Sequence, residues 1–262
     1  MPGVGGMGGT ALEVLARSGV ENFIISDPDE FEVSNLNRQI FSNLEAIGKN
    51  KAETARQRLL SINPQVQVEI LTGQWTDQLP KILSKVDLAI NACDDHLATI
   101  SLMREAQSKG KTVIDAFAST LPNVYVVGKN SPRPEAFLNY LTVGKSLTEI
   151  TAADLEDCRI KEMIHVLVHS STAKHVMLSI AGEMICGKRK RISMAPMVWM
   201  TGLLMAYEAI KEILELPTKV DHRGVFLNPW SMNYEFPRNS LVSFLRRKMV
   251  RRFISSLAES SS

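Results

Sequence analysis

The stretch that decides the fold is GVGGMGG at residues 3–9, which is followed by a predicted helix over residues 10–17. Glycines let a backbone turn tightly and approach a phosphate, and the first turn of a following helix offers unpaired N–H groups. A short apolar segment at 22–25 then predicts a buried strand that ends in Asp27 and Asp29. Together, these segments predict half of a nucleotide-binding βαβ unit.

Asp27 stands about 20 residues beyond the glycine loop, where a carboxylate accepts hydrogen bonds from ribose hydroxyls in dinucleotide-binding folds. A turn-forming role before Pro28 is the alternative interpretation. The same spacing suits an NAD-dependent dehydrogenase. The loop and Asp27 therefore do not separate hydride transfer from ATP use.

Helical and strand patterns alternate through the first half of the chain. The predicted helices are 48–60 and 96–108, and the predicted strands are 66–70, 86–92, 112–115 and 124–127. This alternation predicts an α/β fold with a Rossmann-like, mostly parallel sheet and helices on both faces. No apolar segment precedes the glycine loop, so we expect the first strand of this sheet to be missing.

Beyond Gly128 the composition changes to a loop at 130–134 and a polar, helical segment that reaches Lys190. An apolar helix is predicted over 195–214, and the chain ends in a serine-rich tail. We predict an ATP-binding core over residues 1–128. A helical and irregular insertion and C-terminal region over 129–262 would complete the same domain.

Composition excludes some classes of protein. The 262 residues are 45% hydrophobic with a formal net charge of +2, which suits a compact enzyme and makes no case for general nucleic-acid binding. No secretory signal opens the chain, so we predict a cytoplasmic protein. The longest apolar stretch, 194–210, contains Pro196 and Glu208 and is shorter than a bilayer requires, which predicts a buried helix and no membrane contact.

Three further motifs are specific: SNLNRQ at 34–39, GKNK at 48–51 and ACDD at 92–95. With the glycine loop and Asp27, the sequence resembles the superfamily of ThiF, MoeB, HesA and the ubiquitin-activating enzymes. The signature of that superfamily is a GxGGxG loop, an Asp at a strand end, N-x-x-R-Q, a downstream Lys and an Asp after a buried strand. All five occur here in order.

The resemblance implies a site for ATP and magnesium. It assigns Gly3, Gly5, Gly6 and Gly8 to the phosphates, Asp27 and Asp29 to the ribose, Asn35, Arg38, Gln39 and Lys51 to the phosphate chain, and Asp94 to magnesium and the reacting triphosphate. Attack of a carboxylate on a phosphate brings two anions together, so cations such as Arg38 and Lys51 are required. The structural alternatives are a surface ion pair for Arg38, a solvated helix position for Lys51 and a helix cap for Asp94.

The implied function is an adenylyltransferase that activates a carboxylate as an acyl-adenylate, with the C-terminus of a ubiquitin-like or sulfur-carrier protein or a peptide as substrate. The family resemblance also implies a homodimer. A tRNA-attached carboxylate fits the same chemistry but is not favoured. The alternatives are a non-catalytic partner subunit with this fold and, less favoured, an NAD-dependent oxidoreductase, for which no acid or base beside a nicotinamide is evident.

Cysteine usage limits the remaining chemistry. The chain has no Cys-x-x-Cys pair, so no structural zinc is predicted, although many relatives carry one. Cys186 lies beside the cations of KRK at 188–190, which would favour its thiolate, and an ordinary helix-end cysteine is the alternative. Cys158 is a weaker candidate nucleophile, and Cys93 is expected to be buried.

Two further clusters stay open. His165 and His169 are four residues apart above Glu162 and could share a metal, although packing is the favoured interpretation. The basic run at 246–252, interleaved with Phe244 and Met249, could bind an acidic partner, RNA or an anionic surface. A solvated helix face is the default interpretation of that run.

Overall fold

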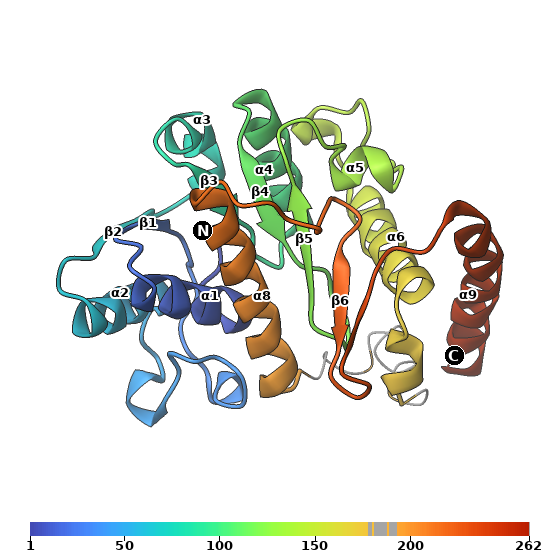
Figure 1. The fold of residues 1–262 in the computed structure, drawn as a ribbon, viewed down its shortest axis with the longest axis horizontal. Coiled ribbons are helices and arrows are strands. Elements are labelled where there is room, and N and C mark those ends of the chain that lie inside the picture. The colour runs from blue at the N-terminus through green and yellow to red at the C-terminus, as the bar shows by residue number, and fades with distance from the viewer. Residues whose placement is uncertain (178–179, 181–187, 189–192, 262) are drawn as a thin grey trace.

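The computed structural model describes residues 1–177, 180, 188 and 193–261, which form two β-sheets with helices packed on both faces (Figure 1). The helices are α1 (Gly6–Arg17), α2 (Lys51–Ile62), α3 (Leu79–Leu83), α4 (His96–Ser108), α5 (Pro134–Phe137), α6 (Ala152–His169), α8 (Ala195–Ile213) and α9 (Ser240–Ser261). The strands are β1 (Asn22–Ile25), β2 (Gln67–Ile70), β3 (Leu88–Ile90), β4 (Thr112–Asp115), β5 (Asn123–Val127), β6 (Val225–Asn228) and β7 (Asn233–Glu235). The α/β fold class is confirmed.

The smaller sheet is parallel, and the larger sheet is mixed in strand direction. β1 pairs with β2 in parallel, whereas the larger sheet has the order β3-β4-β5-β6-β7 with only its β3–β4 pair parallel. β6 and β7 lie in the half of the chain that we expected to be helical and irregular. β6 and β7 have only four and three residues, and their burial does not alternate, so the sequence did not indicate them.

Residues 1–3 run between the two sheets, at the position where we expected the first strand to be missing. The Gly3 N–H donates to the Ser26 carbonyl at 2.8 Å, and the Ala92 N–H donates to the Pro2 carbonyl at 3.0 Å. Among the described residues, no strand lies between β1 and β3. The two hydrogen bonds place the start of the glycine loop at the carboxyl ends of β1 and β3.

The larger sheet buries alternate side chains against different helices. Ile114 and Val126 belong to the core cluster that α1 and α8 complete, and Val113 and Val127 belong to the cluster formed with α3 and α4. Successive residues of a strand point to opposite faces, so both faces are covered. This arrangement matches the predicted layers of helices around the sheet.

Helix α1 begins at Gly6, earlier than the predicted residue 10. Glycine is a poor helix former, which is why the sequence favoured a later start. A Cβ on Gly202 of α8 would lie 2.6 Å from the Met7 carbonyl oxygen, so the two helices are in close contact at this end. Packing of this kind outweighs the low propensity of the first turn. By contrast, β1, α4 and β4 have the predicted bounds.

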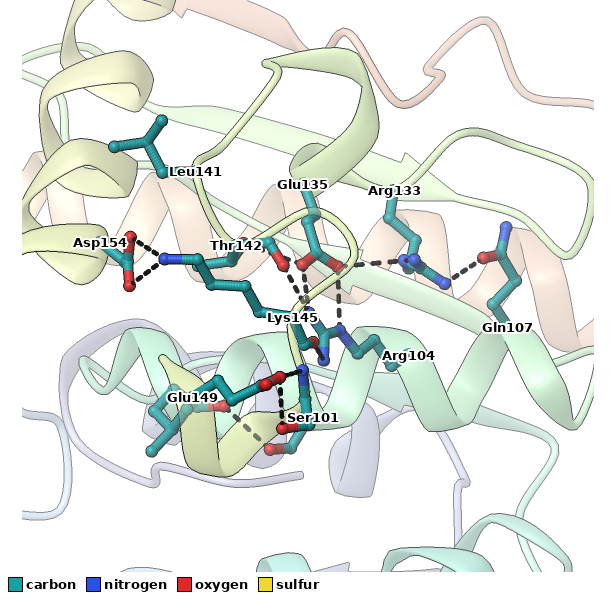
Figure 2. A network of polar contacts seen from close by, with 12 residues as sticks. Ser101, Arg104, Gln107, Arg133, Glu135, Leu141, Thr142, Lys145, Glu149 and Asp154 are labelled. Atoms are coloured by element: carbon teal, nitrogen blue, oxygen red, sulfur yellow. Dashed lines mark hydrogen bonds and ion pairs between the residues drawn. The ribbon is translucent and has the colours of Figure 1, made fainter. Parts of the chain in front are cut away.

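The segment after β5 is tied to the core by a polar network on α4 (Figure 2). Arg104 of α4 forms an ion pair with Glu135, and its guanidinium also donates to the carbonyls of Lys145 and Thr142 at 2.8 and 3.0 Å. Lys145 in turn pairs with Asp154 of α6 at 2.7 Å. The division of the chain at residue 128 stays a prediction. Among the described residues, no helix is both long and apolar enough to cross a membrane.

Candidate functional site

A cavity of about 550 Å³ opens at the carboxyl ends of β1 and β2, beside the start of α2. Its volume is in the range of pockets that bind small molecules and cofactors. The cavity is lined by Ser26, Asp27, Pro28, Asn50, Glu53, Arg56, Val68, Ile70, Leu71, Thr72 and Gly73. Val68 and Ile70 of β2 provide apolar groups, and Glu53 and Arg56 of α2 provide polar groups. This lining suits a nucleobase joined to a sugar.

Asp27 connects this cavity to the glycine loop. Its Oδ2 accepts from the Val4 N–H at 2.9 Å, and its Oδ1 accepts from the Asp29 N–H at 3.1 Å. Burial raises the pKa of Asp27 above its usual value, and these backbone hydrogen bonds oppose the shift. The carboxylate of Asp27, which is predicted to bind ribose, therefore also fixes the glycine loop to the end of β1.

The glycine loop is folded tightly enough to exclude side chains at two positions. A Cβ on Gly3, whose φ is +80°, would lie 2.3 Å from the Ala92 carbonyl oxygen. A Cβ on Gly8 would lie 2.0 Å from the Gly3 carbonyl oxygen. Gly5 faces the side chain of Gln39, and Gly6 faces Val198 of α8. The loop thus lies between the segment that carries Arg38, the segment after β3 and helix α8.

The residues of the N-x-x-R-Q motif lie along this loop. Gln39 is buried against Gly5, and among the described residues its Oε1 has no hydrogen-bond partner. Arg38 donates through Nη1 to the Ser34 carbonyl at 2.8 Å, and its own carbonyl accepts from Trp199 Nε1. Asn35 is buried, and its Oδ1 accepts from the Glu32 N–H at 3.1 Å, which closes the turn. The structure gives Asn35 a local bonding role, and its predicted contact with ATP stays a prediction.

Lys51 and Asp29 form an ion pair at the start of α2. The Lys51 ammonium lies 2.8 Å from Asp29 Oδ2, and only 9% of the lysine side chain is exposed. The Lys51 N–H also donates to the Asp29 carbonyl at 2.9 Å. An ammonium group has three donors, so this ion pair leaves Lys51 able to contact a phosphate as well.

Asp94 lies exposed in the loop after β3, and within the described part of the chain no hydrogen bond or ion pair involves its side chain. The cap of α4 is instead Asp95, whose Oδ1 accepts from the N–H groups of Leu97 and Ala98 at 2.8 and 3.1 Å. The helix-cap alternative for Asp94 is therefore wrong. Mg²⁺ typically binds one or two carboxylates together with substrate phosphates, so an exposed carboxylate such as Asp94 has the chemistry that it requires.

A buried polar network supports the loop that carries Asp94. Asn91 donates through Nδ2 to Asp115 Oδ1 and to Thr99 Oγ1, both at 3.1 Å, and Cys93 donates to Asn91 Oδ1. Burial, followed by the nearby Glu162, raises the pKa of Asp115 to about 7. This network was not predictable from the sequence, because its members lie in the loop after β3, in α4 and in β4 and share no motif.

We expect Asp115→Asn to reduce the dependence of stability on pH. The folded-state pKa of Asp115 is raised, so its favourable contribution is present at low pH and is lost as pH rises through about 7. Asparagine keeps an oxygen that can accept from Asn91 and removes the charge. Thermal unfolding at pH 5.5 and 8.5 should show a smaller difference in Tm for the variant than for the wild type. Asp77→Asn, at an exposed position, is the control and should retain the wild-type difference.

The two described cysteines are poor nucleophiles. Burial raises the pKa of Cys93 to about 11 and that of Cys158 to about 12. The thiolate is the reactive form, so both side chains are essentially unreactive near neutral pH. Cys93 is partly exposed instead of fully buried as expected. Cys186 lies outside the described residues.

The histidine pair of α6 is part of the core. The rings of His165 and His169 lie 4.4 Å apart, and burial lowers their pKa values to about 4 and 3. Glu162 instead contacts His96 at 3.2 Å and Tyr140 at 2.7 Å. No group of three or more potential metal ligands occurs within the described part of the chain. The packing interpretation therefore accounts for this pair.

Asn50 and Arg56 are among the polar residues of the cavity that were not predicted. Asn50 caps α2 and donates through Nδ2 to the carbonyls of Asp27 and Asp29 at 3.2 and 3.3 Å. Arg56 lines the cavity with a buried Nε that has no hydrogen-bond partner among the described groups. Asn50, Glu53 and Arg56 are three residues apart along α2, so the helical period beyond Lys51 could have indicated them.

The sequence is similar to those of several known proteins. The sequence matches the family model described as ThiF family over residues 1–242. It is 32% identical over 119 residues to tRNA threonylcarbamoyladenosine dehydratase of Bacillus subtilis, covering 45% of this chain and 47% of that protein. It is 35% identical over 98 residues to the sulfur carrier protein ThiS adenylyltransferase of Escherichia coli, covering 37% and 39%.

The fold is similar to that of solved structures. The crystal structure of E. coli MccB with ATP matches with a TM-score of 0.61 and 18% identity, covering 90% of this chain and 61% of that chain. The sequence matches span about half or less of the relatives' own length. At this identity the structural likeness concerns the fold alone.

Proposed function

Because this chain belongs to the ThiF family, we propose that it is an ATP-dependent adenylyltransferase that activates a carboxylate as an acyl-adenylate. The observation that carries the proposal is the cavity at the ends of β1 and β2, which Asp27 joins directly to the glycine loop. A base and ribose fit the cavity, and the phosphates then extend along the loop toward Asp94. Backbone N–H groups at a helix N-terminus favour bound phosphates.

In the proposed reaction an oxygen of the substrate carboxylate attacks the α-phosphorus of ATP. A bond forms between that oxygen and the α-phosphorus. The bond between the α-phosphorus and the oxygen that bridges it to the β-phosphorus breaks, and pyrophosphate leaves. The electron pair of the broken bond goes to pyrophosphate, so no proton transfer is required in this step. The product is an acyl-adenylate, whose carbonyl carbon is open to a nucleophile.

The residues of this chain would act mainly by neutralising charge. Arg38 and Lys51 provide two cations for a transition state in which negative charge accumulates on the phosphate oxygens. Asp29 holds the Lys51 ammonium at 2.8 Å and so orients it. Asp94 is the group that would hold magnesium, which, when bound, would supply further positive charge to the phosphates.

For the acyl substrate we favour a small carrier protein or peptide with a C-terminal carboxylate. One named relative is the ThiS adenylyltransferase, and solved relatives include MccB with MccA. A tRNA-attached carboxylate suits the same activation, and another relative is a tRNA threonylcarbamoyladenosine dehydratase, but it is not the substrate we favour. We further propose a homodimer, as the family resemblance implies. A non-catalytic partner subunit is the alternative function.

The test is magnesium-dependent binding of ATP, measured by calorimetry with the wild-type chain and with Asp94→Asn. We expect the variant to bind magnesium–ATP at least about tenfold more weakly, because a charge-assisted contact is lost, and to bind ATP in EDTA as the wild type does. Asp77→Asn removes a carboxylate from an exposed position and is the matched control. ATP–pyrophosphate exchange on addition of a carrier protein would then demonstrate adenylation.

Two results would contradict the proposal. Stabilisation of the fold by NAD but not by ATP in thermal unfolding would favour an oxidoreductase. Absence of binding to both nucleotides would favour the non-catalytic subunit.

A further inference from the structure

Residues 230–252 present an exposed surface of aromatic and basic side chains, which we call the α9 surface. The members from the segment around β7 are Trp230, Met232, Tyr234 and Phe236, and those from α9 are Leu241, Phe244, Leu245, Arg247, Lys248, Met249, Arg251 and Arg252. None of the steps of adenylation described above uses these residues. The cavity proposed to bind ATP lies with β1, β2 and α2 at the opposite end of the molecule (Figure 1).

The two parts of this surface are anchored to the same part of the fold. Glu235, Arg238 and Arg246 each bond to the end of α6 or to the residues that follow it. The partners are Ser171 for Glu235, Val168 for Arg238, and Leu167 and Ser170 for Arg246, at distances of 2.6 to 3.1 Å between backbone and side-chain atoms. Because these anchors come from both the strand segment and the helix, the surface is a preformed part of the fold.

Positive charge is concentrated here although the whole chain has a net charge of only +2. Between Glu235 and Glu259 the sequence contains six Lys or Arg residues and no acidic residue. Two of the six, Arg238 and Arg246, anchor the surface to α6. The other four lie on the exposed side of α9. A local excess of this size attracts a polyanion.

The aromatic side chains add a second property. The Trp230 ring stacks on His175 with centroids 5.7 Å apart and an angle of 12° between the planes, yet 67% of Trp230 is exposed. Tyr234 and Phe236 are more than half exposed, at alternate positions of the same segment. Exposed rings beside cations are the features on which unpaired nucleobases stack while their phosphates are neutralised.

We propose that the α9 surface binds single-stranded RNA, with phosphates on the basic residues of α9 and bases stacked on Trp230 and Tyr234. RNA is favoured over DNA because unpaired bases in loops and at ends are the usual targets of aromatic side chains in RNA recognition. A second copy of this chain is disfavoured because the same charges would face one another. An acidic protein would satisfy the charges but would not require stacked rings.

A lipid bilayer is a poorer match to the pattern on α9. Residues 241, 245, 248 and 252 follow one another at spacings of four and three, so Leu241, Leu245, Lys248 and Arg252 share one outward face. A helix that lies in a membrane interface separates an apolar face from a charged one. Here the same face carries two leucines followed by two cations, so its apolar part spans little more than one turn and offers no long apolar stripe for insertion.

The test is fluorescence anisotropy with a labelled single-stranded RNA of about 12 nucleotides, titrated with the full chain at 50 to 200 mM salt. We expect Arg247→Ala/Lys248→Ala/Arg252→Ala to weaken binding at least about tenfold and to reduce the slope of log affinity against log salt by about 2. Trp230→Ala should weaken binding about tenfold with an unchanged slope, because it removes stacking and no charge.

Matched controls separate this surface from net charge and general exposure. Lys81→Ala/Lys85→Ala/Lys109→Ala removes the same charge from exposed positions on and near α3 and α4, and Tyr207→Ala removes an exposed ring from α8. Both control variants should bind RNA as the wild type does, and circular dichroism should show all variants folded.

Several results would overturn the proposal. These are absence of RNA binding at 50 mM salt, equal losses in the α9 and control variants, and tighter binding of a DNA oligomer of the same sequence. Loss in the basic variant without loss in Trp230→Ala would indicate a general anion site. Stronger binding to vesicles of phosphatidylglycerol and phosphatidylcholine than to RNA would indicate a membrane surface.

Discussion

Replacement of Gly8 by alanine is expected to weaken ATP binding severely. Alanine normally favours a helix over glycine by about 1 kcal/mol, and Gly8 lies in the first turn of α1. Here the new Cβ would lie 2.0 Å from the Gly3 carbonyl oxygen and 2.9 Å from Ala92 Cβ. The contact with Gly3 is to backbone, so the glycine loop itself must move. A displaced loop no longer aligns its N–H groups with the phosphates.

The measurement is calorimetric titration of Gly8→Ala with magnesium–ATP, and we expect affinity to fall by about a hundredfold or more, which corresponds to about 3 kcal/mol. Gly19→Ala is a matched control because Gly19 has a φ of +94° but no atom within 4 Å of its Cβ position. Its backbone strain should cost about 1 kcal/mol of stability and leave ATP affinity unchanged. Wild-type affinity in Gly8→Ala would show that the loop does not hold the phosphates.

Replacement of Arg104 by methionine is expected to cause a large loss in the free energy of unfolding. Arg104 bonds Glu135 and two carbonyls of the segment after β5 (Figure 2). Glu135 is only 4% exposed. Burial acts to raise its pKa, but hydrogen bonds from Arg104 and Thr142 hold that pKa below its usual value. Removal of one partner from a buried ion pair costs about 3 to 5 kcal/mol. Arg133 also lies 3.5 Å from Glu135 and offsets part of the loss, so we expect an effect at the lower end of this range.

Chemical denaturation at pH 7 should therefore show a clearly lower midpoint for Arg104→Met. A second change, Glu135→Gln, removes the buried charge and should restore part of the loss, because the two positions form one network. Arg159→Met breaks the exposed ion pair with Glu156 and should cost less than about 1 kcal/mol. Equal effects of the two arginine replacements would show that the α4 network does not anchor the segment after β5.

Features that depend on neighbouring residues were predictable. The bounds of α4 were predicted from the helical pattern of 96–108, although the sequence indicated Asp94 instead of Asp95 as the possible cap. The bounds of β1 were predicted from a short apolar segment ahead of an acidic turn. The motifs around Gly3, Arg38, Lys51 and Asp94 indicated the ThiF family, which the match over residues 1–242 confirms. The roles of those residues with ATP remain predictions that Asp94→Asn and Gly8→Ala test.

Features that depend on distant residues were not predictable. The contact of Asp115 with Asn91, the ion pair of Arg104 with Glu135 and the pairing of β5 with β6 join segments whose own residues give no sign of their partners. By contrast, the run of glycines predicts a tight loop directly, because glycine permits backbone conformations that other residues disfavour. Burial and the pKa shifts that follow from it arise only when separate elements pack together, because desolvation depends on every group that surrounds a side chain.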